Sequence, residues 1–372
     1  MVDKTEIISN FVNKKHNNMS TKELFGKRLK CAREMKGFSM ADLAGEMSDI
    51  ISRQAICKYE AGKMLPDSSV LIRLANALGV KIDYFFRPFI TGSLAEIEFR
   101  KKAKMSEKSR KALQQQVMDH IERYYEIEDI VGINNTSLPL CKRITVSNRK
   151  DVILFAKQLR NEWNLGNDGI TDVIGLLESK GIKVIEFDAT NDFDGLSGKI
   201  GNDIVIVLNS NIRPTERKRF TALHELGHLI LKFDEALDDK AKEKLCHTFA
   251  SEFLLPIDVF KSLLGDITKS TLNMVKFAEI QHNYGISIDA LLNKAEDEGM
   301  ITGNRYKTYH IRKNTVPAFK EYVERSRIEE EIPHRFISLV YDAYSNSLIS
   351  VSKAATLLNK PVNEVLEKAL FV

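Results

Sequence analysis

The stretch RKRFTALHELGHLILKF, residues 217–233, places two histidines four residues apart and a glutamate directly after the first of them. Apolar residues recur through the stretch at helical spacing, so the sequence predicts a helix with an apolar face that packs on a core. Residues four apart on a helix lie on one face, about one turn apart. The imidazoles of His224 and His228 can therefore reach a single ion.

Glu225 follows the first histidine, where its carboxylate can point at a metal-bound water rather than at the metal. This is the layout of HExxH metallopeptidases, in which zinc lowers the pKa of its water toward ~7 and the glutamate carries the proton to the leaving amine. The alternative for the motif alone is a pair of surface histidines on an amphipathic helix. The predicted burial of this helix beside the strand DIVIVLN, residues 203–209, argues against that alternative.

Candidates for the third ligand lie on the next predicted helix that carries carboxylates, which is AKEKLCHTFASEFLLP, residues 241–256. Glu243 and His247 lie four residues apart on one face of that helix, and spacing alone leaves both open as ligands. Glu252 precedes an apolar run and is interpreted as a solvated or capping carboxylate rather than as a ligand.

The sequence FTALHELGHLIL followed by EKLCHTFASEFLLP resembles the ImmA/IrrE family of zinc metallopeptidase domains, over about residues 150–260. The resemblance implies that His224, His228 and Glu243 bind Zn²⁺ and that Glu225 is the general base. Members of the family often have asparagine where this chain has His247. His247 is therefore expected near the metal pocket, where it stacks under a ligand, donates a proton or competes as a ligand.

The N-terminal part contains GKRLKCAREMKGFSMADLAGEM and, a few residues on, SRQAICKYEAGK. It resembles the Xre (Cro/repressor-like) helix-turn-helix family over roughly residues 24–86. The resemblance places the first motif helix at residues 40–47 and the recognition helix at 52–63. Met40 departs from the glutamine that is frequent in the family, and the turn SDIIS is about two residues longer than its commonest form.

The predicted recognition helix carries side chains that suit DNA. Ser52 can cap the helix, and Arg53, Gln54 and Lys58 then project outward, where they match base edges and phosphates in a major groove. Lys63, at the end of the same stretch, completes the set of expected DNA-binding residues. Any short amphipathic helix exposes such residues, so the DNA-binding interpretation depends on the order of the whole stretch.

Composition is that of an ordinary globular protein. The 372 residues include 43% hydrophobic and 28% charged positions, which allows two or three domains. No apolar run approaches the ~20 residues of a membrane-spanning helix, and the N-terminus lacks the apolar core of a secretory signal, so we expect a cytoplasmic protein without a membrane partner. The four cysteines form no CxxC pair, and a net charge of +4 does not by itself prove a nucleic-acid partner.

Short β-branched runs, KVIEFD, LSGKIG and NDIVIVLNS, predict a small antiparallel sheet amid helices. The fold class is therefore mostly α with a small α+β domain, and the resemblance to the ImmA/IrrE family implies that this domain is zincin-like. The segment around Asp192, Asp194 and residues 195–198 either forms a sheet edge that holds an extended substrate or merely joins two strands. The predicted domains are a flexible arm at 1–20, the helix-turn-helix domain at 21–90, a helical connector at 91–147, the peptidase-like domain at 148–265 and a helical C-terminal region at 266–372.

The combination of the two resemblances implies a DNA-binding transcriptional regulator fused to a zinc-dependent endopeptidase. The endopeptidase would cleave a repressor-type protein or the chain itself, and its activity can be latent. Such regulators occur in stress-response, mobile-element and toxin–antitoxin loci. The expected partners are a pseudo-palindromic DNA operator, a second copy of the chain and a protein substrate or toxin. The alternative is a non-proteolytic repressor or antitoxin in which the zinc-binding domain is structural or docks a partner.

Overall fold

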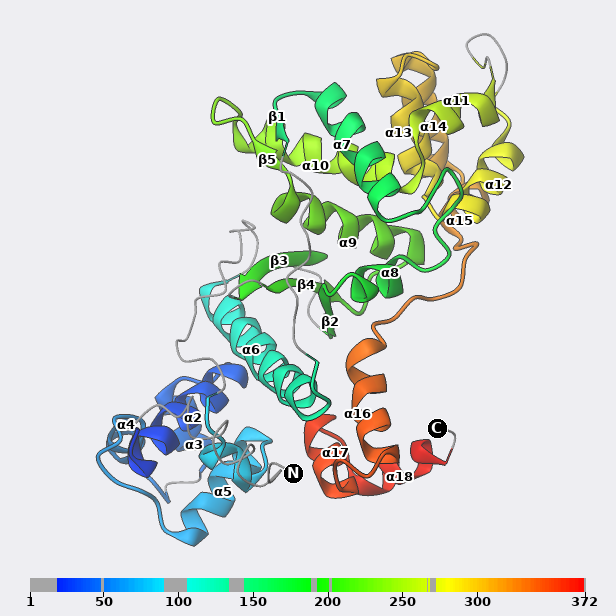
Figure 1. Cartoon of the computed structure of the whole chain (residues 1–372). Helices are drawn as coiled ribbons and strands as arrows, with labels where there is room; N and C mark the ends of the chain where they lie inside the picture. The colour runs from blue at the N-terminus through cyan, green and yellow to red at the C-terminus, as the bar shows by residue number, and fades with distance from the viewer. Residues whose placement is uncertain are drawn as a thin grey trace. The chain divides into compact units, whose positions relative to one another are not determined.

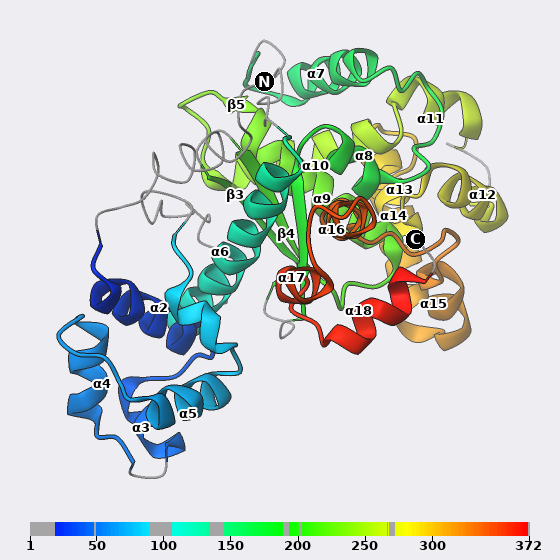
Figure 2. The same ribbon diagram turned by 60° about the horizontal axis from the view of Figure 1, so that its bottom comes forward.

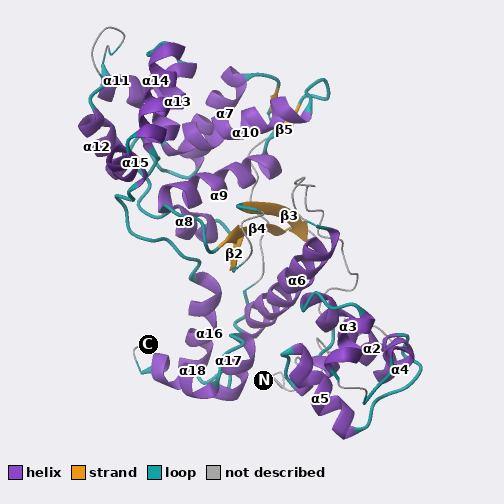
Figure 3. Cartoon of the chain, turned by 180° about the vertical axis from the view of Figure 1, so that it is seen from behind, coloured by secondary structure: helices purple, strands orange, loops and turns teal. Residues whose placement is uncertain are grey.

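The structure is a computed structural model of the whole chain (Figure 1), and it describes residues 19–47, 50–89, 106–133, 144–188, 193–200, 203–265, 267 and 272–370. Helices make up most of these residues and the strands are short (Figure 3), so the predicted fold class is confirmed. Most of the predicted arm and part of the predicted connector lie outside the described residues. No described helix is both long and apolar enough to cross a membrane.

The chain forms two compact units. The first contains residues 1–97, 103–134 and 336–372, and the second contains residues 98–102 and 135–335. The predicted C-terminal region therefore contributes helices to both units.

The first unit begins with a bundle of short helices (Figure 2), namely α2 (Thr21–Met35), α3 (Met40–Glu46), α4 (Arg53–Glu60), α5 (Ser68–Leu78) and the 3₁₀ helix η1 (Ile82–Phe86). Each of the four α-helices follows a serine or aspartate whose side chain accepts a hydrogen bond from the backbone N–H three residues on. These caps satisfy donors that a helix start leaves open. Leu43 of α3 and Ile56 of α4 are fully buried in the core of this bundle with Phe25, Leu29 and Leu74.

Helix α6 (Glu107–Ile130) also belongs to the first unit. It packs on α2 and on the C-terminal helices α16 (Arg335–Ser345), α17 (Val351–Leu357) and α18 (Val362–Ala369). Tyr124 and Ile127 of α6 are fully buried among apolar side chains of these helices. Most of the described part of the predicted connector is therefore a helix that forms part of a core, and its last residues form strand β1 (Thr145–Val146) of the second unit.

The second unit holds a three-stranded sheet in the order β2 (Lys183–Phe187), β4 (Asp203–Asn209), β3 (Gly195–Ile200). Strand β3 pairs antiparallel with β4, whereas β2 pairs parallel with it. The prediction of a purely antiparallel sheet is therefore wrong. In the described sheet, β3 and β4 follow one another in the chain and pair antiparallel. Strand β2 lies on the other side of β4 and runs parallel to it, and a parallel pair needs a longer connection than a tight turn.

Helix α9 (Thr215–Ile230), which carries HELGH, lies between this sheet and the helices α10 (Asp239–Leu254) and α7 (Arg149–Glu162) (Figure 1). It contacts β3 and β4 on one side and α10 on the other. Leu223 and Leu226 are buried in the core, as the apolar face of the helix predicts. A short helix, α8 (Val173–Ser179), and a two-stranded parallel ladder, β1 (Thr145–Val146) with β5 (Lys232–Phe233), complete this part.

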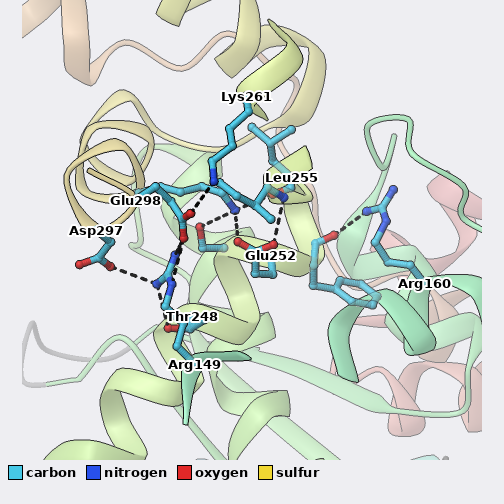
Figure 4. Close-up of polar contacts among 12 residues, drawn as sticks. Arg149, Arg160, Thr248, Glu252, Leu255, Lys261, Asp297 and Glu298 are labelled. Carbon is cyan, nitrogen blue, oxygen red and sulfur yellow. Dashed lines mark hydrogen bonds and ion pairs between the residues drawn. The ribbon is translucent and has the colours of Figure 1, made fainter. Parts of the chain in front are cut away.

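Five helices follow among the described residues of the second unit, namely α11 (Ile257–Leu264), α12 (Met274–Tyr284), α13 (Ile288–Asp297), α14 (Gly303–Thr315) and α15 (Pro317–Glu324). Charged side chains connect α10 and α7 to these helices (Figure 4). Glu252 forms a buried ion pair with Lys294 and accepts a hydrogen bond from the backbone N–H of Ile257, at the start of α11. Glu252 is thus a capping carboxylate, and its interpretation as a solvated one is wrong because only 3% of it is exposed.

Candidate metal centre

Helices α9 and α10 bring three candidate ligands together. His224 and His228 are buried on α9, and Glu243 reaches them from the first half of α10. His224 Nε2 lies 3.1 Å from Glu243 Oε2, and His228 Nε2 lies 3.2 Å from Glu243 Oε1. The two Nε2 atoms are 3.1 Å apart. Within the described parts of the chain, these three residues form the one cluster of histidine, cysteine or carboxylate side chains with ligand atoms all within 4.8 Å.

The donor set fits a zinc ion. Two unprotonated imidazole nitrogens and a carboxylate that converge on one point repel one another unless a proton or a cation lies between them. Zinc holds nitrogen and oxygen ligands at about 2.0–2.2 Å in a tetrahedron, which puts neighbouring ligand atoms roughly 3.3 Å apart. The separations of 3.1 and 3.2 Å are close to this value. Three protein ligands leave a fourth position open, as catalytic zinc sites do.

Glu225 lies in the interior beside the two histidines. It is 2% exposed, and its Oε2 accepts a hydrogen bond of 2.9 Å from the hydroxyl of Ser197 on β3. Sequence reasoning missed Ser197. The available signal was a small polar residue in a short apolar strand that pairs with the strand preceding the HELGH helix. Gly195 on the same strand allows the close approach, because a Cβ there would lie 3.3 Å from Glu225 Cγ.

His247 lies at the edge of the three-residue cluster. Its ring stacks on Phe220, with the ring centroids 5.8 Å apart, and lies 4.3 Å from the ring of His224. The side chain is exposed, on the turn of α10 that follows Glu243. These ring contacts agree with stacking, one of the three roles that the sequence leaves open for His247.

The residues expected to bind DNA gather on α4 and just beyond it. Ser52 accepts a hydrogen bond from the N–H of Ala55 and so caps the helix. Arg53, Gln54 and Lys58 are exposed, whereas Ile56 and Tyr59 are buried.

The predicted end of the recognition helix at residue 63 is wrong by three residues, because α4 ends at Glu60. Gly62 takes a left-handed conformation, with φ of 69°, which a helix cannot continue through. Lys63 is therefore exposed in the turn after α4 rather than on the helix itself. Part of the SDIIS turn, residues 48–49, lies outside the described residues.

Comparisons with known proteins agree with both parts of this description. Residues 177–296 match a peptidase family described as IrrE N-terminal-like domain, and this match contains all the candidate metal-site residues. Residues 26–87 match a helix-turn-helix domain.

Two individual proteins are also similar. The SPbeta prophage-derived uncharacterized HTH-type transcriptional regulator YonR of Bacillus subtilis (strain 168) is 45% identical over 67 residues, which is 17% of this chain and 57% of that protein. The chain thus matches little more than half of that relative's length. The apo form of the competence regulator ComR from Streptococcus vestibularis is 13% identical, covering 95% of this chain and 92% of that one, with a TM-score of 0.17. The chain joins a helix-turn-helix domain to an IrrE N-terminal-like domain.

Proposed function

We propose that this protein is a DNA-binding transcriptional regulator that carries a zinc-dependent endopeptidase. The observation that carries the proposal is the convergence of His224, His228 and Glu243 beside the buried Glu225, in a domain that matches a peptidase family. The helix-turn-helix domain and the similarity to a protein named as a transcriptional regulator support the first half. Since DNA is the partner of that half, the protein acts in the cytoplasm.

The residues of the site have distinct roles in peptide hydrolysis. His224, His228 and Glu243 would hold Zn²⁺, which supplies a Lewis acid and an acidified water when bound. Glu225 accepts a proton through the oxygen that does not face Ser197 and returns it to the leaving amine. The Ser197 hydroxyl holds the other oxygen, Oε2, and so fixes the direction in which the base points.

The substrate is an extended segment of a protein. Strand β3 is the end strand of the described sheet and carries Ser197 past the site, and we propose that an extended peptide binds alongside this strand. The substrate is a repressor-type protein, or a second copy of this chain. Asp194, at the start of this edge, pairs with Arg217 at 2.6 Å, and Asp192 lies outside the described residues.

The DNA-binding half uses the exposed face of α4. Arg53 and Gln54 have the donor and acceptor groups that read guanine and adenine, and Lys58 and Lys63 suit phosphates. One such domain covers a half-site, so we propose a homodimer on a pseudo-palindromic operator.

Substitution of Glu225 by glutamine tests the peptidase. The purified chain is analysed for zinc and incubated with a tagged Glu225→Gln chain, which serves as substrate in trans but cannot cleave itself. About one zinc per chain in both proteins, with fragments that require the wild-type chain and disappear with a chelator, is the expected result. Glu235→Gln, at an exposed position after the same helix, is the matched control and keeps cleavage. Cleavage by Glu225→Gln alone contradicts the proposal.

A second candidate is a repressor or antitoxin whose zinc-binding domain docks a partner, such as a toxin, without cleaving it. The similarity to a protein named only as a transcriptional regulator favours this candidate. It predicts that Glu225→Gln has no effect on regulation in the cell, whereas Arg53→Ala and Gln54→Ala abolish it.

A further inference from the structure

His228 has a partner on the side of its ring that faces away from Glu243. The Sγ of Cys246 lies 3.2 Å from His228 Nδ1, and both residues are buried. The other ring nitrogen, Nε2, is the one that faces Glu243 and His224. The thiol and the candidate ion therefore contact opposite nitrogens of one imidazole, and Cys246 cannot bind the same ion as His228 in this arrangement.

One turn of α10 supplies both groups that act on His228. Glu243 and Cys246 are three residues apart and so lie on neighbouring positions of one helix face. Gly227 on α9 allows the two helices to meet closely at this point. A Cβ at residue 227 would lie 3.1 Å from Phe249 Cδ1 and 3.4 Å from Cys246 Sγ. An added Cβ would therefore crowd the ring of Phe249 and would be in ordinary van der Waals contact with the thiol.

The two histidines of the motif differ in this respect. His224 Nδ1 is buried and has no hydrogen-bond partner among the described residues. Histidines that bind metals usually donate their second N–H to a neighbouring acceptor, which fixes the tautomer and the ring orientation. Of the two candidate histidine ligands, His228 has a partner at its second nitrogen, and this partner is a sulfur rather than the usual carboxylate or carbonyl oxygen.

We propose that Cys246 is a positioning residue for the metal centre. The Nδ1–H of His228 donates to Cys246 Sγ, so Nε2 keeps its lone pair and points at the place where His224 and Glu243 converge. The thiol acts through His228 and touches neither the ion nor the substrate. This inference rests on the proposed zinc site but not on peptidase activity, because it concerns the affinity for the ion.

The test is zinc affinity, measured by competition with a chromophoric chelator on the purified full-length chain at pH 7. Loss of a group that orients a ligand typically costs 10–100-fold in metal affinity. We expect Cys246→Ala to weaken zinc binding by that factor and Cys246→Ser, whose oxygen also accepts the N–H, to recover at least part of the loss. Cys57→Ala, at an exposed position on α4, is the matched control and leaves zinc affinity unchanged.

A second measurement tests the role of Cys246 even if the Cys246→Ala variant folds poorly. The ¹⁵N chemical shifts of His228 in the metal-free chain distinguish the two tautomers. We expect the Nδ1–H form in the wild type and in Cys246→Ser, and a mixture of tautomers in Cys246→Ala. Equal zinc affinity in all three chains, or an Nε2–H tautomer in the wild type, overturns the role of Cys246. A wild-type chain that binds no zinc refutes the metal centre as a whole. Zinc binding without proteolysis refutes only the peptidase.

Discussion

Arg28 donates through Nη1 to Glu122 Oε2 over 2.7 Å, and both side chains are almost completely buried. The pair joins α2 of the helix-turn-helix bundle to α6. The same guanidinium donates through Nε and Nη2 to the backbone carbonyls of Arg87 and Pro88. Each of the three guanidinium nitrogens of Arg28 therefore has an acceptor, which makes burial of the charge tolerable.

Removal of Glu122 leaves the buried guanidinium of Arg28 without a carboxylate partner, whereas removal of Arg28 leaves Glu122 paired with Arg87 at 3.2 Å. We predict that Glu122→Gln destabilises the first unit by about 3–5 kcal/mol, because a broken buried ion pair has no compensation from water. Arg28→Met destabilises it by less, because Arg87 still pairs with Glu122. The double change to apolar residues, Arg28→Met with Glu122→Leu, costs less than either single change. Urea unfolding, monitored by far-UV circular dichroism, measures the free energy of unfolding of each variant.

Lys108 provides the control for this prediction. Its Nζ lies 3.8 Å from Asp42 Oδ2, and both side chains are largely exposed, at 67% and 48%. Exposed pairs contribute roughly 0–1 kcal/mol, so Lys108→Met leaves the unfolding curve almost unchanged. If Lys108→Met and Arg28→Met lower the free energy of unfolding by similar amounts, then the number of charges, and not the burial of the pair, determines the effect.

The sequence predicted the elements that follow from short-range patterns. The caps at Ser52 and the HELGH helix depend on residues three or four apart, and both are visible in one stretch of sequence. The contacts that sequence could not predict join elements distant along the chain. Ser197 meets Glu225 only because β3 passes over α9, and the buried pair of Glu252 with Lys294 exists only because α13 returns to α10. The hydrogen-bond partner of a polar residue on a short strand or helix cannot be predicted from the sequence when that partner is distant along the chain.

Glu331 is a buried carboxyl in the second unit. Its Oε2 accepts hydrogen bonds from the N–H groups of Val173 and Ile174 at the start of α8, and its Oε1 lies 3.0 Å from Arg219 Nε. Burial nonetheless dominates and raises the pKa of Glu331 from its usual 4.5 to about 7, against the opposing effect of Arg219 and the two N–H groups. The folded chain therefore holds this proton more tightly than the unfolded chain does.

The sign of the resulting pH dependence follows from linkage. A carboxyl with a raised pKa in the folded state stabilises most below pH 4.5, and this contribution is lost as the pH rises toward 7. We predict that Glu331→Gln removes up to roughly 3 kcal/mol of this pH-dependent stability difference. Urea unfolding at pH 5 and pH 8 with a chelator present, followed by the fluorescence of the only tryptophan, Trp163, measures it. An unchanged difference between the two pH values in Glu331→Gln would assign the effect to other groups.

Lys58 on α4 is predicted to contact a phosphate rather than a base. Lys58→Ala should weaken binding to all DNA sequences alike and reduce the slope of log affinity against log salt by about 1, since one counterion fewer is released. Arg53→Ala should instead weaken binding to the preferred operator more than to random DNA. Binding is measured by fluorescence anisotropy over a series of salt concentrations. Lys368→Ala, an exposed position on α18, is the control, and a slope change of equal size there would remove the assignment to α4.

Gly195 on β3 is predicted to be required at its position by packing. An added Cβ would lie 2.8 Å from Thr221 Cγ2, a distance that real side chains do not tolerate, and 3.3 Å from Glu225 Cγ. Gly195→Ala must therefore move β3 away from α9, which costs about 1–3 kcal/mol and takes Ser197 away from the Glu225 carboxylate.

A glycine-to-alanine substitution at Gly45 is predicted to have the opposite effect on stability. Gly45 lies inside α3, and an added Cβ there would meet no atom within 4 Å. Gly45→Ala should stabilise the chain by about 0.5–1 kcal/mol, because alanine loses less backbone freedom in a helix than glycine does. Thermal unfolding of the two variants compares them directly. If Gly195→Ala proves as stable as the wild type, β3 does not pack on α9 closely enough to position Ser197 against Glu225.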